Sequence, residues 1–255
     1  MWNPASPYNL LPGLPPPFRE TAKIFRQTTR SRVVLERLHQ TVRLLPEKEI
    51  FVQIIPVLEA QASSEIENIA AATDSLFRII DADTQADDAA KEVLRYRQAL
   101  GKGMESLKRC PLSLRTMTAV SSALRGTNVS VRKLDGTCIA SASSGQVIYT
   151  PPAGEALILE KLHNLVEFLH SPSEMDPLVK MAIAHYQFEA IHPFSDGNGR
   201  TGRILNLLYL AESGLLSQPV LNLSRYFIRN KPKYYAALLN VTKEGAWENW
   251  ILFML

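Results

Sequence analysis

The sequence predicts a mainly α-helical fold with one small β-hairpin, and three observations support this. Apolar residues recur at helical spacing through most of the chain. Residues that begin or end helices stand at the expected places, as at Asp176, Pro177 and Pro193. Only residues 128–152 change character, to short β-branched stretches separated by turn residues.

Composition describes an ordinary globular protein. The chain has 255 residues, of which 46% are hydrophobic and 21% charged, which suffices for one large domain or a domain with an appendage. A net charge of +3 does not predict nucleic-acid binding. Cys110 and Cys138 lack metal-ligand spacing and are expected to be reduced packing residues. With no signal-peptide pattern and no apolar run of membrane-spanning length, we expect a cytoplasmic protein.

The N-terminal part is expected to be an extended arm followed by two helices. Six prolines in residues 1–17 predict an arm that lies on the domain, although residues 14–16 could also be read as a ligand for a proline-binding domain. Residues 18–45 predict a long amphipathic helix whose basic residues face solvent. Residues 46–62 predict a second helix, kinked at Pro56.

The same spacing predicts the remaining helices. They are expected over 73–80 (followed by a turn at 81–83), 86–103, 111–126, 156–169, 176–191, 204–210, 230–244 and a closing stretch around 247–253, and residues 223–227 are expected to form a short turn or helix. Val129, Val131 and the Asp135–Gly136 turn predict a short strand pair, and residues 146–149 predict another extended piece.

Chemically capable side chains concentrate in residues 190–203, which read AIHPFSDGNGRTGR. Pro193 should end the preceding helix near Ile191 and place His192 on a loop. Gly197 and Gly199 permit a tight loop that cradles an anion, at the start of a helix whose dipole favours negative charge. The string therefore joins two helices through an expected anion-binding loop.

The charged residues of this string indicate which anion to expect. Arg200 and Arg203 lie three apart, on one helix face, which suits a polyanion between them. Asp196 is a carboxylate suited to Mg²⁺, which proteins hold with one or two carboxylates plus substrate phosphates. His192 can take up and release a proton near neutral pH. The string thus predicts a site for the phosphates of a nucleotide, with a metal and a base.

Other interpretations of the string fit less well. Residues 197–202 match G-x-G-x-x-G, but a dinucleotide fingerprint requires a preceding strand, and a helix is expected there. The chain has no G-x-x-x-x-G-K-[ST] phosphate loop. A metal site of His185, His192 and Asp196 is disfavoured because Pro193 takes His192 off the helix. A purely structural loop would not need all these charges and glycines.

The string fits the motif H-x-F-x-[D/E]-G-N-G-R-x-x-R at every specified position, so the chain resembles the Fic family. The resemblance implies a helical bundle with a β-hairpin flap, and an enzyme that moves AMP from ATP to a Ser, Thr or Tyr hydroxyl of another protein. It implies that His192 is the base, that Asp196 holds Mg²⁺, and that Phe194 anchors the loop. The implied nucleotide-binding stretch comprises Gly197, Asn198 (including its side chain), Gly199, Arg200, Thr201, Gly202 and Arg203, with Arg203 on the γ-phosphate.

A second motif concerns regulation. Ser63, Glu67 and Asn68 fit the inhibitory pattern [S/T]-x-x-x-E-[G/N] of the same family. The resemblance implies that Glu67 pairs with Arg203, blocks the γ-phosphate position and misplaces the α-phosphate. A carboxylate can replace a phosphate on a guanidinium in this way. The alternative is an ordinary capping box, with a serine at the start of a helix followed by a glutamate.

The resemblance also implies how the nucleoside and the target are bound. Residues 128–152 would form the flap, with Val147, Ile148 and Tyr149 covering the nucleotide and aligning the target by strand addition. The chain lacks the Trp-Ile-Gly-like sequence often found there, and a surface hairpin without function is the alternative. Asn230, Tyr234 and Tyr235 would wall the nucleoside, with core packing the alternative for one of the two tyrosines.

Taken together, these patterns predict residues 1–110 as an N-terminal helical region carrying the inhibitory motif and residues 111–255 as a Fic catalytic domain. The expected activity is adenylyl transfer to an unidentified target protein, autoinhibited by Glu67, and the resemblance also allows self-modification and a homodimer. The alternatives are a de-AMPylase or phosphotransferase using the same site, or a non-catalytic ATP-binding regulatory module. No membrane partner is expected, because no apolar run is long enough. No nucleic-acid partner is expected either: the net charge is small, and the resemblance implies a winged-helix domain in many relatives that is naturally absent here or lost by shortening.

Overall fold

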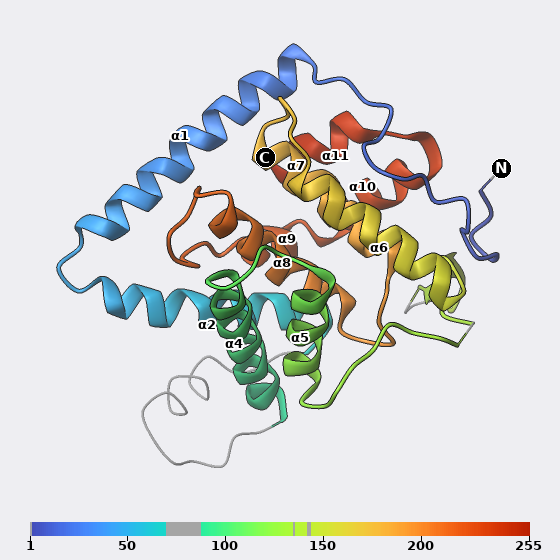
Figure 1. Cartoon of the computed structure of the whole chain (residues 1–255), viewed down its shortest axis with the longest axis horizontal. Coiled ribbons are helices and arrows are strands. Elements are labelled where there is room, and N and C mark those ends of the chain that lie inside the picture. The colour runs from blue at the N-terminus through green and yellow to red at the C-terminus, as the bar shows by residue number, and fades with distance from the viewer. Residues whose placement is uncertain (1, 70–87, 135, 142–143) are drawn as a thin grey trace.

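The computed structural model describes residues 2–69, 88–134, 136–141 and 144–255, and it is mainly α-helical, as predicted (Figure 1). The helix expected over 73–80 and the turn at 81–83 lie outside the described residues. The helices are α1 (Ala22–Leu44), α2 (Lys48–Ile66), α4 (Asp88–Leu107), α5 (Leu114–Arg125), α6 (Glu155–His170), α7 (Pro177–Ile191), α8 (Asn198–Glu212), α9 (Ser224–Arg229), α10 (Lys231–Glu244) and α11 (Trp247–Met254). The strands are β1 (Ile139–Ala140) and β2 (Val147–Tyr149).

The core is built around α7 and α8, which pack against each other and are buried along nearly their whole length. Helices α4, α5, α6 and α11 contact this pair from outside. The amphipathic helices α4 and α5 turn apolar faces inward, including Val93, Leu100, Met117 and Leu124. The loop between α7 and α8 is thus fixed at both ends by buried helices.

Helices α1 and α2 form the outer N-terminal part of the molecule (Figure 1). α1 begins at Ala22, later than expected, where the Thr21 side chain accepts a hydrogen bond from the Ile24 N–H at 3.3 Å. It turns back into α2, which passes α4 and α9 and ends beside α8.

α2 is longer than predicted. It continues through Pro56 to Ile66 rather than ending near residue 62, because Ala60, Ala62 and Ile66 keep its apolar face buried. Ser63 therefore lies in the last turn of α2, and its interpretation as the first residue of a capping box is wrong.

A buried carboxylate ties α2 to its neighbours. Glu59 accepts hydrogen bonds from the Ser224 N–H at 2.8 Å and the Ser224 hydroxyl at 2.5 Å, which belong to the start of α9. It also accepts from the Tyr96 hydroxyl of α4 at 3.2 Å. Because a buried carboxylate is costly unless hydrogen-bonded, these three donors fix the position of α2 relative to α4 and α9.

The β-hairpin differs from the predicted one. β2 lies where an extended piece was expected, but it pairs antiparallel with β1, and residues 129–131 form no strand. The reason is that this segment bonds elsewhere: the Val129 N–H donates to the Ser122 hydroxyl at 3.0 Å, and the Arg132 N–H donates to the Pro193 carbonyl at 2.9 Å. The expected Asp135–Gly136 turn rests partly on Asp135, which is outside the described residues.

The N-terminal arm lies on the domain, as expected. Leu11 and Leu14 are buried. The Asn164 side chain of α6 accepts from the Leu14 N–H at 2.6 Å and donates to the Leu14 carbonyl at 3.0 Å, and Gln187 of α7 donates to the Pro12 carbonyl at 2.9 Å. With Leu14 committed to its own domain, the arm is a strap rather than a free proline-rich ligand.

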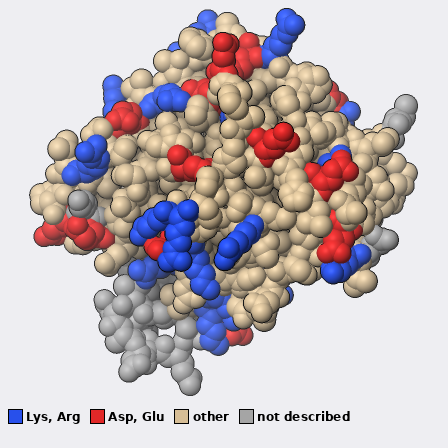
Figure 2. Space-filling model, viewed as in Figure 1, with Lys and Arg blue, Asp and Glu red and all other residues tan. Residues whose placement is uncertain are grey.

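The surface corrects one expectation. Cys110 and Cys138 are free thiols, but both are exposed, so the expectation that they pack in the core is wrong. Lys and Arg lie among Asp and Glu on the face shown in Figure 2, in keeping with the small net charge. In the parts of the chain that the structure describes, no helix is both long and apolar enough to span a bilayer.

Candidate active site

The site begins where α7 ends. The helix starts with Asp176 accepting from the Leu178 N–H at 2.8 Å, and it ends at Ile191, as predicted. His192 follows in the left-handed region with φ 50°, and Arg132 closes the helix end: its Nε donates to the His192 carbonyl at 2.8 Å and its Nη2 to the carbonyls of Ile191 and Pro152. Sequence reasoning missed Arg132, although a cation is favourable at a helix C-terminus.

The loop itself is held by Asn198. Its side-chain oxygen accepts from the Phe194 N–H at 2.9 Å and its side-chain nitrogen donates to the Phe194 carbonyl at 2.7 Å. Phe194 is fully buried, as an anchor should be. The Asn198 side chain thus holds the loop backbone, and each end of its amide keeps one further hydrogen-bonding position; its predicted contact with phosphates stays a prediction.

The start of α8 presents free donors. Gly197 takes φ 77°, and the first hydrogen bond inside the helix runs from the Thr201 N–H to the Gly197 carbonyl at 2.9 Å. The N–H groups of Asn198, Gly199 and Arg200 precede that bond, as at any helix N-terminus. Thr201 and Gly202 are buried inside the helix, and the Gly197 N–H already donates to Asp196, so of the predicted nucleotide-binding stretch only Asn198, Gly199 and Arg200 can offer a backbone N–H to an anion.

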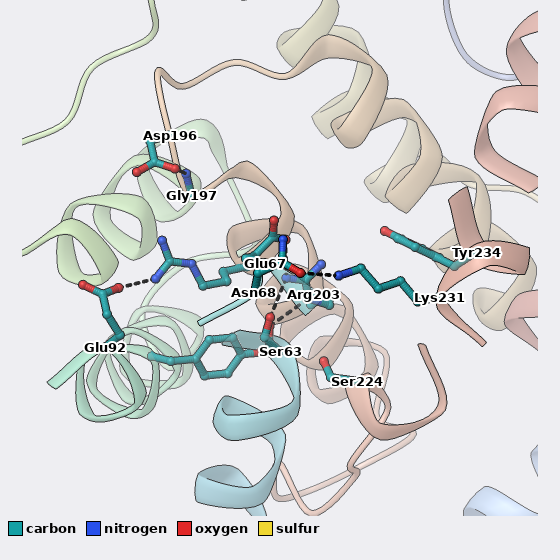
Figure 3. Close-up of polar contacts among 12 residues, drawn as sticks. Ser63, Glu67, Asn68, Glu92, Asp196, Gly197, Arg203, Ser224, Lys231 and Tyr234 are labelled. Carbon is teal, nitrogen blue, oxygen red and sulfur yellow. Dashed lines mark hydrogen bonds and ion pairs between the residues drawn. The ribbon is translucent and has the colours of Figure 1, made fainter. Parts of the chain in front are cut away.

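Arg203 is fully buried and meets two residues of the second motif (Figure 3). Its Nε donates to the Ser63 hydroxyl at 2.8 Å, and its Nη2 donates to the Ser63 carbonyl at 2.9 Å and to Glu67 Oε1 at 2.7 Å. Burial opposes ionisation of Glu67, but the Arg203 charge lowers the pKa of this carboxyl below its usual value. The contact predicted between Glu67 and Arg203 is therefore present.

Two further residues shape that contact. A Cβ on Gly199 would overlap Glu67 Oε1, so only glycine lets Glu67 approach the loop backbone this closely. Asn68 takes φ 63°, and its side-chain oxygen accepts from the Lys231 ammonium at 2.9 Å. Of the predicted motif, Ser63 and Glu67 reach Arg203, whereas Asn68 bonds the start of α10 (Figure 3).

Arg200 is also paired. Its Nη1 donates to Glu92 of α4, and its side chain is only 4% exposed. Sequence reasoning missed Glu92, because a charged residue on an amphipathic helix usually just faces solvent.

Asp196 is the candidate metal ligand. The half-exposed carboxylate accepts from the Gly197 N–H at 2.6 Å through Oδ1 and forms an ion pair with Arg125 through Oδ2. Within the described ranges, no three His, Cys, Asp or Glu side chains group to hold a metal. One carboxylate fits Mg²⁺ when substrate phosphates supply the other ligands.

The metal site considered from His185, His192 and Asp196 does not form. Both ring nitrogens of His185 are engaged, one with the Tyr234 hydroxyl at 2.8 Å and the other with the Asn206 side chain at 3.1 Å.

His192 carries an imidazole that is neutral at neutral pH. Burial, and then the neighbouring Arg132 charge, lower the pKa of His192 to about 4, so the ring is neutral at neutral pH. Its Nδ1 atom is buried, and no hydrogen-bond partner for it occurs among the residues that are described. One turn earlier, burial raises the pKa of Glu189 to about 7 against the nearby Arg203 charge. Sequence reasoning passed over Glu189, although it is the one acid within the mainly buried helix α7.

The three residues predicted to wall the nucleoside have different environments in the structure. Tyr234 is buried, its hydroxyl bonds His185, and its ring stacks on Phe227 with centroids 4.9 Å apart, so the packing alternative holds for it. Tyr235 is 44% exposed, and burial followed by the Glu67 charge raises its pKa, which places it toward the site. Asn230 donates to the Tyr226 carbonyl at 3.0 Å.

The three predicted flap residues also differ in how exposed their side chains are. Ile148 is exposed and Val147 is half-buried. Tyr149 is buried, and its hydroxyl donates to the Ala190 carbonyl at 2.8 Å, so it supports the end of α7. Its predicted contact with a nucleotide stays a prediction.

Family models match most of this architecture. The model described as "Fic/DOC family N-terminal" matches residues 25–105, and the one described as "Fic/DOC family" matches residues 111–210. The second match contains the whole loop between α7 and α8, and the first contains Ser63, Glu67 and Glu92.

Curated relatives share a shorter region. The protein adenylyltransferase fic-1 of Caenorhabditis briggsae is 41% identical over 92 residues, which are 35% of this chain and 17% of that protein. A probable protein adenylyltransferase of Aquifex aeolicus (strain VF5) is 38% identical over 98 residues, which are 38% of this chain and 28% of that protein. The match thus spans less than a third of the length of either relative.

Solved structures share the fold over nearly the whole chain. A Fic family protein from Desulfovibrio desulfuricans G20 superposes with a TM-score of 0.75 at 22% identity, covering 94% of this chain and 72% of the other. Fic-1 (residues 134–508) from Caenorhabditis elegans gives a TM-score of 0.70 at 23% identity, covering 91% and 68%. At such identities the likeness establishes the fold.

Proposed function

The chain belongs to the Fic/DOC family, and on that premise we propose that it is a nucleotidyltransferase that moves AMP from ATP to a hydroxyl side chain of a target protein. The observation that carries the proposal is the loop from His192 to Arg203, which joins a neutral base to a helix N-terminus and two arginines. The names of the relatives that share this region, protein adenylyltransferases, support the same reaction.

His192 would act as the base. A target hydroxyl next to the ring gives up its proton to the neutral imidazole as its oxygen attacks the α-phosphorus of ATP, and pyrophosphate leaves on the opposite side. The low pKa of His192 keeps the ring able to accept that proton through the neutral range. The imidazolium formed later releases the proton to solvent.

The start of α8 would bind the phosphates. The N–H groups of Asn198, Gly199 and Arg200 and the dipole of α8 favour the negative charge that the phosphates bring. Arg200 and Arg203 add two cations on the same helix face. Asp196 would hold Mg²⁺, which when bound neutralises phosphate charge, and Arg125 would then leave Asp196.

Glu67 would keep the resting protein weakly active. It bonds Arg203 at 2.7 Å and lies against Gly199, where a Cβ has no room. A γ-phosphate held by Arg203 needs the same guanidinium edge, so Glu67 and the γ-phosphate compete for it. In this proposal residues 1–110 supply the inhibitory carboxylate to a catalytic domain formed by residues 111–255.

The target would dock at the hairpin. β2 carries the exposed Ile148 in a sheet of two short strands, and a target segment can add its own backbone to such an edge. The hydroxyl delivered in this way is a Ser, Thr or Tyr of another protein or of the chain itself.

Label transfer tests the proposal. Purified wild type, Glu67→Gly and Glu67→Gly/His192→Ala are incubated with Mg²⁺ and ATP labelled at the α-phosphate, in the presence of a cell lysate. We expect weak labelling of protein by wild type, stronger labelling by Glu67→Gly and none by the double variant.

A parallel reaction with γ-labelled ATP separates the alternatives. Label from the γ-phosphate on protein indicates a phosphotransferase, and loss of AMP from a prelabelled protein indicates the reverse reaction. ATP binding without transfer of either label, even in Glu67→Gly, would replace the enzyme by a nucleotide-binding regulatory module.

A further inference from the structure

Both arginines of the loop meet a carboxylate from the N-terminal helices, but the two contacts differ in which nitrogens they use. On Arg203, Nε and Nη2 are both occupied, by Ser63 and Glu67. These two nitrogens form the side of a guanidinium that can bond two oxygens of one phosphate in parallel. The contact with α2 therefore fills the edge of Arg203 that a phosphate would use.

Arg200 shows the opposite arrangement. Glu92, which is labelled in Figure 3, bonds its Nη1, and among the described residues no side-chain partner is found for the Nε–Nη2 edge. The Nε atom is buried and finds no hydrogen-bond partner in the described part of the chain. Nη2 lies 3.9 Å from the point where Gly197 would carry a Cβ, so this edge is at the anion-binding loop.

Glu92 is itself held in place. Its other oxygen accepts from Arg95 Nη1 at 2.6 Å, one turn along α4, and its side chain is 22% exposed. Helix α4 packs on both α5 and α8. Glu92 also supplies negative charge to an arginine that is nearly buried at a helix N-terminus, where a lone cation is unfavourable.

We propose that Glu92 is a positioning residue for the transfer reaction. It bonds Nη1 of Arg200 and thereby presents Nε and Nη2 to two oxygens of a nucleotide phosphate bound at the start of α8. Glu92 and Glu67 thus have opposite effects: Glu67 competes with a phosphate for Arg203, and Glu92 prepares Arg200 to receive one. The inference rests on the proposed function for the identity of the anion.

The test measures ATP affinity as well as transfer. In the Glu67→Gly protein, which exposes Arg203, Glu92→Gln keeps the size of the side chain and one acceptor oxygen but removes its charge. We expect the Kd for Mg·ATP, measured by calorimetry, to rise about tenfold, the effect of one weakened charge-assisted contact. Glu105→Gln, an exposed residue of the same helix, should leave the Kd unchanged.

A double-variant cycle separates positioning from simple structural support. If Glu92 acts through Arg200, Glu92→Gln has no further effect on the Kd or on kcat/KM once Arg200→Met is present. Equal losses in both backgrounds, or a lowered Tm with an unchanged Kd, would overturn the inference.

The same data separate failure of this inference from failure of the proposed function. If the Glu67→Gly protein binds ATP but labels no protein, the proposed function fails, and the Kd cycle still decides the role of Glu92. If label is transferred and Glu92→Gln changes neither Kd nor kcat/KM, only the inference fails. Absence of ATP binding by the Glu67→Gly protein would overturn both.

Discussion

The hydrogen bonds that Ser63 and Glu67 make to Arg203 can be removed one at a time by mutation, and each removal should change the transfer rate by a different amount. Among the described residues, Ser63 supplies two of the three acceptors that bond this guanidinium, and its hydroxyl bonds Nε at 2.8 Å. The neighbouring Ser64 is also buried, but its hydroxyl has no hydrogen-bond partner in the described residues. Two adjacent serines of one helix turn thus offer a matched pair for mutation.

We expect Ser63→Ala to raise the rate of label transfer a few-fold, less than Glu67→Gly does. The substitution removes a bond to a charged group, about 1.5–3 kcal/mol, part of which is lost only from the resting contact. Label transfer and ATP affinity of both variants measure the effect. Ser64→Ala is the control and should behave as wild type; activation by both serine variants would point to general loosening of α2.

A second prediction at this scale concerns Arg125 and Asp196. The ion pair neutralises the carboxylate that is expected to hold Mg²⁺, so a metal must displace a fixed cation. We expect Arg125→Gln, in the Glu67→Gly protein, to lower the Mg²⁺ concentration for half-maximal transfer by a factor of about 2–5, as for a partly exposed pair of up to about 1 kcal/mol.

The exposed Arg115 of the same helix provides the control, since Arg115→Gln should leave the Mg²⁺ dependence unchanged. A higher Mg²⁺ requirement in Arg125→Gln would show instead that Arg125 assists binding of the metal or the nucleotide.

Among the elements, the last two turns of α7 and the residue after it place His185, Glu189 and His192 at intervals of four and three residues, and burial shifts the pKa of each. Burial lowers the pKa of His185 to about 3 and that of His192 to about 4, and it raises that of Glu189 to about 7. The histidines favour the folded state more as the pH rises from about 4 to 6.5, because the unfolded chain then binds more protons. Glu189 has the opposite effect, because it makes the folded state less stable as the pH rises.

The sign for Glu189 follows from its raised pKa. Between pH 4.5 and 7 the unfolded chain releases the proton of this carboxyl while the folded chain retains it, so stability is lost as the pH rises. We expect Glu189→Gln to gain up to about 2 kcal/mol of unfolding free energy relative to wild type between pH 5 and pH 7. Urea unfolding at both pH values measures this, and the histidines cancel in the comparison.

Exposed Glu65 supplies the control, since Glu65→Gln should show no such change. A constant difference between Glu189→Gln and wild type at the two pH values would mean that Glu189 is ionised in the folded protein throughout this range.

Helix ends that are marked by capping residues or prolines could be predicted from the sequence. Helix ends and strand pairs that depend on contacts with distant segments could not. Asp176, Pro177 and Pro193 fixed the ends of α7 because capping and proline effects act within a few residues. The end of α2 was misplaced because burial against α8, which no local pattern reports, extends the helix. The strand partner was wrong because Val129 and Arg132 bond to α5 and to the loop after α7 instead.

For the whole molecule, the N-terminal arm joins segments far apart in sequence. It reaches α6 through Asn164, α7 through Gln187, and the residue after β2 through the Tyr8 N–H, which donates to the Thr150 carbonyl at 3.0 Å. We expect Asn164→Ala to lower the free energy of unfolding by about 1–3 kcal/mol, because it leaves two backbone groups of Leu14 without their partners.

Chemical unfolding gives this change, and limited proteolysis should cut faster within residues 1–17. Asn249→Ala, at an exposed position of α11, should alter neither measurement. Unchanged proteolysis in Asn164→Ala would mean that Leu11 and Leu14 hold the arm without the amide.

In the candidate site, residues of one contiguous stretch could be predicted from the sequence, whereas most residues supplied by other segments could not. His192, Asp196, the glycines and both arginines are contiguous, so one stretch of sequence predicted them together. Arg125, Arg132 and Glu92 complete the site from other segments, and each looks like an ordinary charged residue in its own sequence context. Glu67 was found only because it lies in a recognisable motif.

The fixed position of α2 has a consequence for how the proposed inhibition can be relieved. Glu59, two turns before Glu67, is bonded by Ser224 and Tyr96, so Glu67 behaves as a tethered ligand with a high effective concentration at Arg203. In the proposed inhibition, ATP competes with Glu67 for Arg203. The effective concentration of Glu67 in that competition is set by the fixed position of α2 as well as by the strength of the ion pair. If the proposed inhibition holds, a change that breaks the Glu59 bonds would lower the effective concentration of Glu67 at Arg203 and thereby lower the ATP concentration needed for activity.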